Sequence, residues 1–450
     1  MVITDEMKRA IELIETTNDS IYITGKAGTG KTTFLKWLVD NCDKNFVVAA
    51  STGIAAINAE GVTLHSLFNI PFGVHDPNSK IKNGIYQKKL ELMNAIDALI
   101  IDEVSMVRPD MIDYIDQKLR IYRKSKEPFG GVQVIMFGDL YQLPPVVVKN
   151  EREILLEFYP GAYFFYANVF RDSGFHIVEL NHIFRQTNER FIEILNHVRS
   201  YQLTEDDIED LSSVRDKALS EKMDGSHIHI CSHKRDVQRI NTKMLGEPTH
   251  SYEASINGEF KIESAPCDQT LDLRKGARVM MLANDKMQRY CNGSLGVVSE
   301  LNDSLIQVEL DNGYTVNLER HEWSTQEYKM QDGKIVSEIK GTCSQFPLTL
   351  AWAITIHKSQ GLTFDNIAIH TKGVFCPGQI YVALSRCTSL EGIVSDVFID
   401  RRHILPDREL LAFEKAYKTT GHIFNNETYK LMYESNQGKN KEKRKASADN

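Results

Sequence analysis

Short apolar runs alternate with stretches of helical spacing along the first 150 residues. The runs SIYITG, NFVVAAST, DALIIDEVSM and VQVIMFGD follow one another, with a helical pattern after each of the first three. Apolar runs of this length are typical of buried strands. Strands that alternate with helices form a mostly parallel sheet with helices on both faces. The pattern therefore predicts an α/β domain.

Two segments break this alternation. Residues 69–87, NIPFGVHDPNSKIKNGIYQ, are rich in Gly, Pro and Asn and predict an inserted hairpin or loop. The α/β pattern restarts near Phe175 with FHIVEL, a long helical stretch to Tyr201, and SHIHICS. Between Gly293 and Ile339, VVSELNDSLIQVELDNGYTVNLERHEW predicts short antiparallel strands joined by N-D and D-N-G turns. Apolar runs of the α/β type then return in PLTLAWAITI, NIAIH and DVFID.

Composition limits the class of protein. A chain of 450 residues favours about three domains, at ~150 residues each. Its 25% charged and 42% apolar residues are those of an ordinary globular protein. No apolar run approaches the ~18 residues of a membrane span, and the N-terminus lacks the layout of a signal peptide. The seven cysteines stand singly, which favours a reducing compartment and argues against structural zinc. We expect an intracellular protein with no membrane partner.

Charge and histidines give weaker signals. The net charge of −8 argues against general electrostatic binding of nucleic acid, but it permits a local basic groove. The C-terminal QGKNKEKRKASADN is expected to be a disordered, solvated tail, with a minor role in nucleic-acid binding as the alternative. In SHIHICSH, alternation puts His227 and His229 on one face of a strand, near His233. A half-exposed strand end is favoured there over a metal site.

The strongest chemical signal is GKAGTGKT, from Gly25 to Thr32. It matches the phosphate-binding pattern G-x-x-x-x-G-K-[ST], follows the strand SIYIT and opens the helix TFLKWLVD. Glycines let backbone N–H groups turn inward around phosphates at a helix N-terminus. Lys31 would supply positive charge to the β- and γ-phosphates, and Thr32 a hydroxyl to Mg²⁺. In the first half of the chain, the residues expected to bind the nucleotide are Gly28, Thr29, Gly30, Lys31, Thr32 and Thr33.

A nucleotide hydrolase also needs acidic groups at the end of a neighbouring strand. In ALIIDEVSM, four apolar residues precede Asp102 and Glu103. We expect Asp102 to hold the magnesium shell and Glu103 to orient and deprotonate the attacking water. The run VIMFGD leads to Gln142, whose amide suits a hydrogen bond to a γ-phosphate or to water. The alternative for Gln142 is an amide that caps a loop.

Seven motifs follow one another in a family order: GKAGTGKT, STGIAAINAEGVTLHSLF, IIDEVSM, FGDLYQLPPV, NHIFRQTNERF, LAWAITIHKSQGLTFD and QIYVALSRCTSLEG. Together they resemble superfamily 1 DNA helicases, most of all the Pif family of the 5′→3′ branch, related to RecD. The resemblance covers residues 20 to 400.

It implies an α/β fold of two RecA-like domains with ATP and Mg²⁺ in their cleft. A small wedge would be inserted in the first domain and an SH3-like barrel in the second. The implied ranges are 1–175 with the wedge at 69–87, then 176–292 with 343–430, the barrel at 293–342, and the tail at 436–450.

The resemblance also assigns roles to residues far from the phosphate loop. Arg185 in IFRQT and Arg386 in ALSRC would stabilise charge on the γ-phosphate; a surface salt bridge is the alternative for either. Hydroxyls and other groups that bind phosphate without reading bases would contact DNA. The residues expected to bind DNA in the first domain are Thr52, Gly53, Thr63, His65, Ser66, Phe68 and Pro144; those in the second are His233, Lys234, Asn241, His357 and Lys358. Phe68 and Pro144 are also candidates for stacking on a base, but local packing is favoured over stacking for both.

The stretch TIHKSQG, Thr355 to Gly361, lies between two apolar runs. A turn with no task is more often built from Asn, Asp, Pro and Gly. We assign Gln360 and Gly361 to nucleotide sensing and the two preceding basic residues, His357 and Lys358, to DNA phosphates. One loop or short helix would then contact both ligands. The alternative is that His357 merely caps the strand end.

The resemblance implies an ATP-hydrolysing, 5′→3′ DNA helicase and translocase in replication, repair or recombination, acting as a monomer on single-stranded and forked or structured DNA, in the bacterial cytoplasm or a eukaryotic nucleus or mitochondrion. A DNA-stimulated ATPase without processive unwinding is the alternative. A GTPase is disfavoured because N-K-x-D is absent, and a small-molecule kinase needs no second α/β domain. Met7 stands where the family carries an adenine-reading glutamine, which leaves base selectivity open. The preferred DNA structure and the protein partners also stay open.

Overall fold

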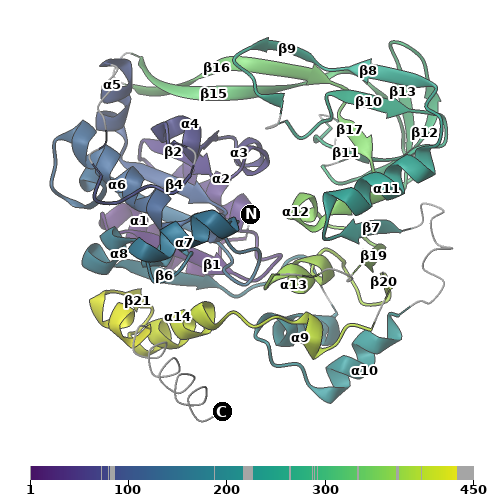
Figure 1. The fold of residues 1–450 in the computed structure, drawn as a ribbon. Helices are drawn as coiled ribbons and strands as arrows, with labels where there is room; N and C mark the ends of the chain where they lie inside the picture. The colour runs from purple at the N-terminus through teal and green to yellow at the C-terminus, as the bar shows by residue number, and fades with distance from the viewer. Residues whose placement is uncertain are drawn as a thin grey trace.

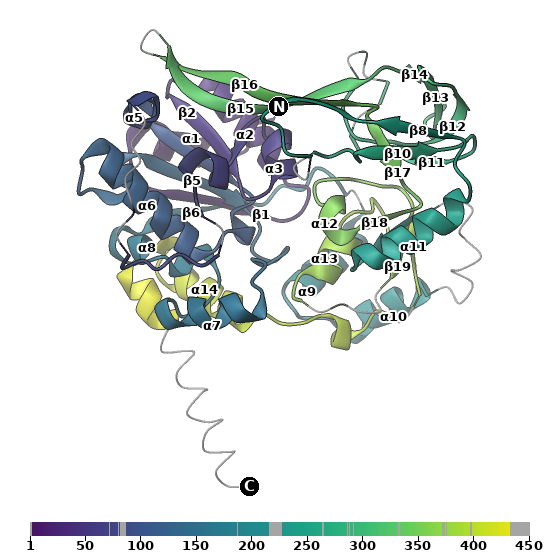
Figure 2. The same cartoon turned by 45° about the horizontal axis from the view of Figure 1, so that its top comes forward.

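A computed structural model describes residues 2–71, 73–79, 81, 87–186, 188–215, 227–262, 265–285, 287, 289–290, 292–331, 334–370, 374, 376–396 and 398–432. Two α/β bodies lie side by side, and a β hairpin runs above both of them (Figures 1 and 2). Among the described residues, none of the helices is long and apolar enough to cross a membrane. The six cysteines in this part of the chain are free thiols.

The first body is built on a seven-stranded sheet of order β21-β6-β1-β5-β4-β2-β3, parallel except for β21. The strands are β1 (Ile21–Gly25), β2 (Phe46–Ala50), β3 (Val62–Thr63), β4 (Ala98–Asp102), β5 (Gln133–Gly138), β6 (Phe175–Leu180) and β21 (Ile423–Phe424). The helices are α1 (Asp5–Thr16), α2 (Lys31–Asn41), α3 (Gly53–Asn58), α4 (Leu64–Phe68), α5 (Gln87–Ala95), α6 (Pro109–Arg123), α7 (Lys149–Phe158), α8 (Asn168–Ser173) and α14 (Arg408–Thr419), with 3₁₀ turns η1 (Val104–Met106), η2 (Pro128–Gly131) and η3 (Phe164–Tyr166).

Both faces of this sheet are buried. Along β1, Ile21 and Ile23 pack with the apolar sides of α1 and α2, whereas Tyr22 packs with the cluster that includes α6 and α8. Because side chains alternate between the faces of a strand, a run that is apolar at every position needs a cover on each side. The prediction of a parallel sheet with helices on both faces is confirmed here.

The second body contains a four-stranded parallel sheet of order β18-β7-β19-β20. Its strands are β7 (Ile228–Cys231), β18 (Ala353–Thr355), β19 (Ile367–His370) and β20 (Ile393–Ser395). Its helices are α9 (Glu189–Arg199), α10 (Glu205–Ser213), α11 (Lys234–Leu245), α12 (Ile356–Ser359) and α13 (Gln379–Leu384), with the 3₁₀ turn η6 (Arg401–His403).

Antiparallel strands form the upper part of this side of the molecule (Figure 2). They make a five-stranded sheet of order β14-β13-β12-β11-β17, a three-stranded sheet β15-β16-β9 and a pair β10-β8. The strands are β8 (His250–Glu253), β9 (Ser255–Gly258), β10 (Thr270–Leu273), β11 (Arg278–Met281), β12 (Leu295–Leu301), β13 (Ile306–Leu310), β14 (Thr315–Leu318), β15 (His321–Gln331), β16 (Lys334–Gln345) and β17 (Leu348–Leu350). The long β15–β16 hairpin reaches across to α5 of the first body (Figure 1).

Three predicted boundaries differ from the structure. The strand β6, expected to start the second domain, pairs with β1 instead, and β21 pairs with β6. The end of the chain therefore returns to the first body, where Phe413 of α14 stacks on Phe165 with ring centroids 4.3 Å apart. The antiparallel region also begins at β8, well before residue 293.

A further difference concerns the apolar run 348–354. This run was expected to form one buried strand, but it forms two: β17 pairs with β11 in the antiparallel sheet, and β18 pairs with β7 in the parallel sheet. An apolar run alone carries no signal for such a change of sheet. The SH3-like character of the insertion stays a prediction. Part of the expected wedge (72, 80 and 82–86) and the expected tail (436–450) lie outside the described residues.

Of the histidines near β7, His227 is half-exposed, as expected, but His229 differs from expectation. His229 is buried rather than half-exposed, and its Nδ1 lies 2.8 Å from Nε2 of His370 on the adjacent strand β19. Among the residues that the structure describes, no group of three or more His, Cys, Asp or Glu side chains is placed to hold a metal ion.

Candidate nucleotide and nucleic-acid sites

The phosphate loop connects β1 to α2, as the sequence predicts. Gly28 and Gly30 have φ of 81° and 78°, a left-handed conformation that favours glycine. A Cβ on Gly28 would lie 2.7 Å from Cβ of Arg185, so the loop and the segment after β6 are in close contact. Lys31 Nζ donates to the carbonyl oxygens of Gly25 and Lys26 at 2.7 and 3.1 Å. Burial lowers the pKa of Lys31, and an anion beside the ammonium would oppose that shift.

The flanking threonines differ in exposure. The Thr29 side chain is buried, and its hydroxyl donates to the Lys26 carbonyl at 2.9 Å. Thr32 and Thr33 are exposed in the first turn of α2. The Thr32 hydroxyl is therefore accessible at a helix N-terminus, where the helix dipole also favours anions.

The acidic pair lies at the carboxyl end of β4. Asp102 is buried and accepts a hydrogen bond from the backbone N–H of Glu103 at 2.9 Å. Glu103 has φ 51° and ψ 46°, a conformation that costs energy for a residue with a Cβ and that recurs at functional sites. Burial raises the pKa of both carboxyl groups, since two neighbouring anions in a buried site are unfavourable without a cation.

Gln360 brings the second body to this pair. Its Nε2 donates to Glu103 Oε2 at 3.3 Å and to Gln142 Oε1 at 3.2 Å. Gln360 follows α12, the short helix that the polar stretch between the two apolar runs forms. Glu103, Gln142 and Gln360 were each predicted from separate motifs, and the structure brings these three side chains together.

Both predicted arginines belong to this interface, and neither forms a salt bridge with another residue in the described part of the chain. Arg185 Nη1 and Nη2 donate to the carbonyl oxygens of Ser385 and Gly361 at 3.2 and 3.3 Å. Arg386 is 1% exposed, and its guanidinium donates to backbone oxygens and to the Ser385 hydroxyl of its own body. Burial lowers the pKa of each guanidinium, and the neighbouring Arg185 charge also lowers that of Arg386.

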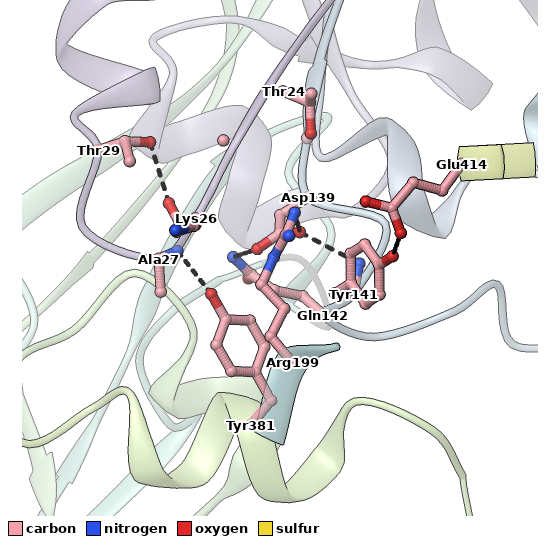
Figure 3. A network of polar contacts seen from close by, with 12 residues as sticks. Thr24, Lys26, Ala27, Thr29, Asp139, Tyr141, Gln142, Arg199, Tyr381 and Glu414 are labelled. Atoms are coloured by element: carbon pink, nitrogen blue, oxygen red, sulfur yellow. Dashed lines mark hydrogen bonds and ion pairs between the residues drawn. The ribbon is translucent and has the colours of Figure 1, made fainter. Parts of the chain in front are cut away.

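Two residues of the site were missed from the sequence. The hydroxyl of Tyr381 on α13 accepts a hydrogen bond from the phosphate-loop N–H of Ala27 at 2.8 Å (Figure 3). Arg199, the last residue of α9, donates to Asp139 after β5 at 3.2 Å. Tyrosine and arginine inside amphipathic helices give no local signal for these contacts. The motif QIYVALSR offered the only indication, because Tyr381 precedes Arg386 by five positions.

The residues of the first body that were expected to contact DNA differ in their exposure and in their hydrogen bonds. The hydroxyls of Thr52 and Thr63 accept hydrogen bonds from Ala55 and Ser66 N–H groups at 3.2 Å each, and so cap α3 and α4. Phe68 is fully buried, which agrees with the favoured interpretation of local packing; its inclusion among the residues that bind DNA is wrong. Pro144 is half-buried and Ser66 is exposed. Gly53 begins α3, and burial lowers the pKa of His65.

In the second body, Lys234 and Lys358 are exposed, and His233 precedes α11 as its N-cap residue. Burial, then the charge of Lys234, lowers the pKa of His357, and both causes favour the neutral imidazole. Thr355, and not His357, caps α12, because its hydroxyl accepts from the Lys358 N–H at 3.1 Å.

Asn241 is a correction. Its side-chain amide donates to the carbonyl of Ala353 at 2.9 Å and accepts from the N–H of the same residue at 2.8 Å. Both ends of the amide therefore join α11 to β18, and the structure gives Asn241 a structural role in place of the expected DNA contact.

Met7 is buried in α1, where it packs with Ala10 and Ile14 in the core beneath the sheet. A thioether is a weak acceptor and no donor, so it offers little for reading a base edge. The base selectivity of the site stays a prediction.

The residues fit a magnesium nucleotide. The glycine conformations make a turn that can receive a phosphate. The buried Asp102 and the half-buried Glu103 interact electrostatically with Lys31, and Thr32 is exposed at the start of α2. Oxygen donors of this kind are those that Mg²⁺ prefers. Thr32 and Asp102 would hold the ion, as predicted.

A family model described as PIF1-like helicase matches residues 2–209. The chain is 30% identical over 423 residues to ATP-dependent DNA helicase Pif1 of Bdellovibrio bacteriovorus, covering 92% of each chain. It is 35% identical over 413 residues to ATP-dependent DNA helicase PIF1 of Danio rerio, with 89% of this chain and 62% of the relative covered. It therefore spans under two thirds of that relative's length.

Among solved structures, the chain is similar to Bacteroides sp Pif1 in complex with ADP-AlF4. The TM-score is 0.90 at 55% identity, and 94% of this chain and 99% of that chain are covered. The same Bacteroides protein bound to ssDNA matches with a TM-score of 0.71 at 55% identity over the same shares.

Proposed function

The chain belongs to the PIF1-like helicase family, and from that premise we propose that it is an ATP-dependent DNA helicase that moves 5′→3′ along single-stranded DNA. ATP with Mg²⁺ would be hydrolysed between the two bodies. The substrates would be single-stranded and forked or structured DNA in replication, repair or recombination. Its place would be where genomic DNA is found, in a bacterial cytoplasm or a eukaryotic nucleus or mitochondrion.

One observation carries this proposal. Gln360 of the second body donates to both Glu103 and Gln142 of the first, and it lies three positions after His357 on the same short segment. A hydrolysis site completed by a second body suits a motor, because each turnover can then change how the two bodies are placed. A small-molecule kinase or a GTPase has no need for that arrangement.

The roles of the residues follow from their chemistry. Backbone N–H groups of the phosphate loop and the Lys31 ammonium bind the β- and γ-phosphates. Glu103 accepts a proton from the attacking water, which Gln142 and Gln360 orient. Arg185 and Arg386 stabilise the charge that develops on the transferring phosphoryl group once the bodies close. Mg²⁺, when bound, neutralises charge between the phosphate groups.

The proposed DNA path crosses the tops of both bodies. The residues proposed to contact the phosphates are Thr52, Gly53, Thr63, His65, Ser66, Pro144, His233, Lys234, His357 and Lys358. Hydroxyl, backbone and cationic groups such as these hold a phosphate chain without reading its sequence. A motor that moves along any sequence requires binding of that kind.

The test is unwinding of forked duplexes that carry a single-stranded tail of either polarity, beside ATP hydrolysis with and without single-stranded DNA. We expect strong stimulation by DNA, unwinding only from a 5′ tail, and loss of hydrolysis when EDTA removes Mg²⁺. Glu103→Gln should retain nucleotide binding and lose turnover. Glu300→Gln, the same change at an exposed position of β12, is the matched control. Unwinding from a 3′ tail would refute the direction, and DNA stimulation without unwinding would leave only a DNA-stimulated ATPase.

A further inference from the structure

A buried ion pair crosses from one body to the other near the phosphate loop. Arg199 belongs to α9, which packs against α13 in the second body, and its Nη2 donates to Asp139 Oδ1 of the first body at 3.2 Å. The guanidinium also lies over the ring of Tyr141, with Cζ 4.1 Å from the centroid. Both charged side chains are buried (Figure 3).

Asp139 also contacts Gln142, a residue of the proposed hydrolysis site. Its Oδ1 accepts from the Tyr141 N–H at 3.1 Å, and its Oδ2 lies 3.4 Å from the donor Nε2 of Gln142. The other end of the Gln142 amide, Oε1, is the atom that accepts from Gln360. Arg199 is thus two contacts from the residue that we assign to the attacking water.

The second body holds the same loop from another direction. A Cβ on Gly378 would lie 1.9 Å from the carbonyl oxygen of Gln142, so only glycine permits this approach. Gly378 has φ 79°, the left-handed conformation that glycine adopts without strain. The backbone around Tyr141 and Gln142 is therefore held between Arg199 and Gly378, and its position depends on where the second body lies.

The pairing of Arg199 is incomplete. Within the described part of the chain, its Nε is buried without a hydrogen-bond partner. The guanidinium lines a small cavity together with Tyr201, Tyr381 and His403. A buried ion pair of this kind is weak evidence for added stability, because removing the two charges from water costs free energy. Such pairs are better explained by the relative position of the groups that they fix.

We propose that Arg199 is a positioning residue for ATP hydrolysis, which acts through Asp139 to set Gln142 against the attacking water when the two bodies close. This inference rests on the proposed function and deepens it. Arg199 does not contact the nucleotide, and its role is to make the placement of Gln142 depend on the placement of α9. Its removal should lower kcat and leave the KM for ATP and the affinity for single-stranded DNA nearly unchanged.

The experiment compares the full chain with Arg199→Met, which keeps an unbranched aliphatic stem, and with Arg199→Lys, which keeps the charge. Arg190→Met is the matched control for kcat, because Arg190 lies on the same helix in ion pairs with Glu193, Asp207 and Asp210 of the second body. The double variant Asp139→Asn with Arg199→Met removes both charges. DNA-stimulated kcat, KM for ATP, Kd for single-stranded DNA and Tm are measured for each.

We expect Arg199→Met to lower the stimulated kcat at least tenfold, with KM and Kd within about threefold. Arg199→Lys should fall between the parent and Arg199→Met, and Arg190→Met should equal the parent. The double variant should regain the Tm of the parent without regaining its kcat. Recovery of kcat together with Tm would mean that a stranded charge caused the loss, and would overturn the inference.

A kcat within twofold of the parent in Arg199→Met would overturn it as well, and so would an Arg199→Lys no more active than Arg199→Met. If Arg199→Met does not fold, Arg199→Lys and the double variant still decide the matter. The parent is measured first: absence of DNA-stimulated hydrolysis there refutes the proposed function, whereas a stimulated parent with unaffected variants refutes only the role of Arg199.

Discussion

Gln360→Ala should slow ATP turnover without weakening the binding of either ligand. The substitution removes the two hydrogen bonds that Gln360 Nε2 donates, to Glu103 Oε2 at 3.3 Å and to Gln142 Oε1 at 3.2 Å. A hydrogen bond contributes ~0.5–1.5 kcal/mol net, and more when one partner is charged. Both contacts are longer than the usual ~2.9–3.0 Å, so we take about 1–2 kcal/mol for the pair. At ~1.4 kcal/mol per factor of ten, kcat should fall roughly 5- to 30-fold.

The assay is steady-state ATP hydrolysis against single-stranded DNA concentration, with ATP varied at saturating DNA. The control is Gln307→Ala, since Gln307 lies on β13 and bonds to Asn317 at 2.9 Å, away from the nucleotide site. The Kd for DNA without nucleotide should match the parent in both variants. A Gln360→Ala with the kcat of the parent would refute the reasoning, and so would a loss expressed only in KM, because Gln360 would then bind ATP uniformly instead of acting at the transition state.

Three further predictions concern other parts of the chain. Lys31→Ala should abolish hydrolysis with DNA affinity within a few-fold, and near-parental turnover would refute the assignment of the phosphate loop. His357→Ala should lower DNA stimulation more than the basal rate, by a coupling of ~1–3 kcal/mol; an unchanged half-saturating DNA concentration and stimulated rate would exclude His357 from the DNA path. Phe413→Ala should destabilise the first body by ~3–5 kcal/mol in denaturant unfolding, because this buried ring stacks on Phe165; a loss under 1 kcal/mol would show that α14 contributes little to that core.

Local pattern was enough to predict the strand, loop and helix that we propose to hold the nucleotide. The phosphate loop combines a strand, two glycines and a helix within a dozen residues, and the acidic pair follows directly on an apolar run. Each signal is short because the physical requirement is local: a positive φ, a helix N-terminus, a strand end. A loop or a short helix was expected between the runs ending at Ile354 and starting at Ile367, since polar residues cannot continue a buried strand, and the structure has the short helix α12 there.

What the sequence missed depends on partners far along the chain. Phe68 was included among the DNA-binding candidates because aromatic rings stack on bases at nucleic-acid sites, yet the helix α4 turns that ring into the core, in agreement with the favoured local packing. Asn241 was expected at a phosphate because it follows a histidine and a lysine, but β18 uses both ends of its amide. The local sequence around such a residue is the same whether its side chain packs inside the protein or contacts DNA. Only the residues that it meets in the folded structure decide between these two roles. The return of β21 to the first sheet is of the same kind.

Three contacts between the two bodies could not be predicted as pairs from the sequence. They join Ala27 with Tyr381, Glu103 with Gln360, and Asp139 with Arg199. At ~0.5–1.5 kcal/mol each, the three together contribute about 1.5–4.5 kcal/mol. A ligand must favour one of two states by ~5.5 kcal/mol to move a population from 1:99 to 99:1. The sum for these three contacts is below that figure, so the binding of nucleotide or DNA could replace all three. Contacts that a ligand can replace suit the proposed motor, which must leave each arrangement of the bodies once per ATP.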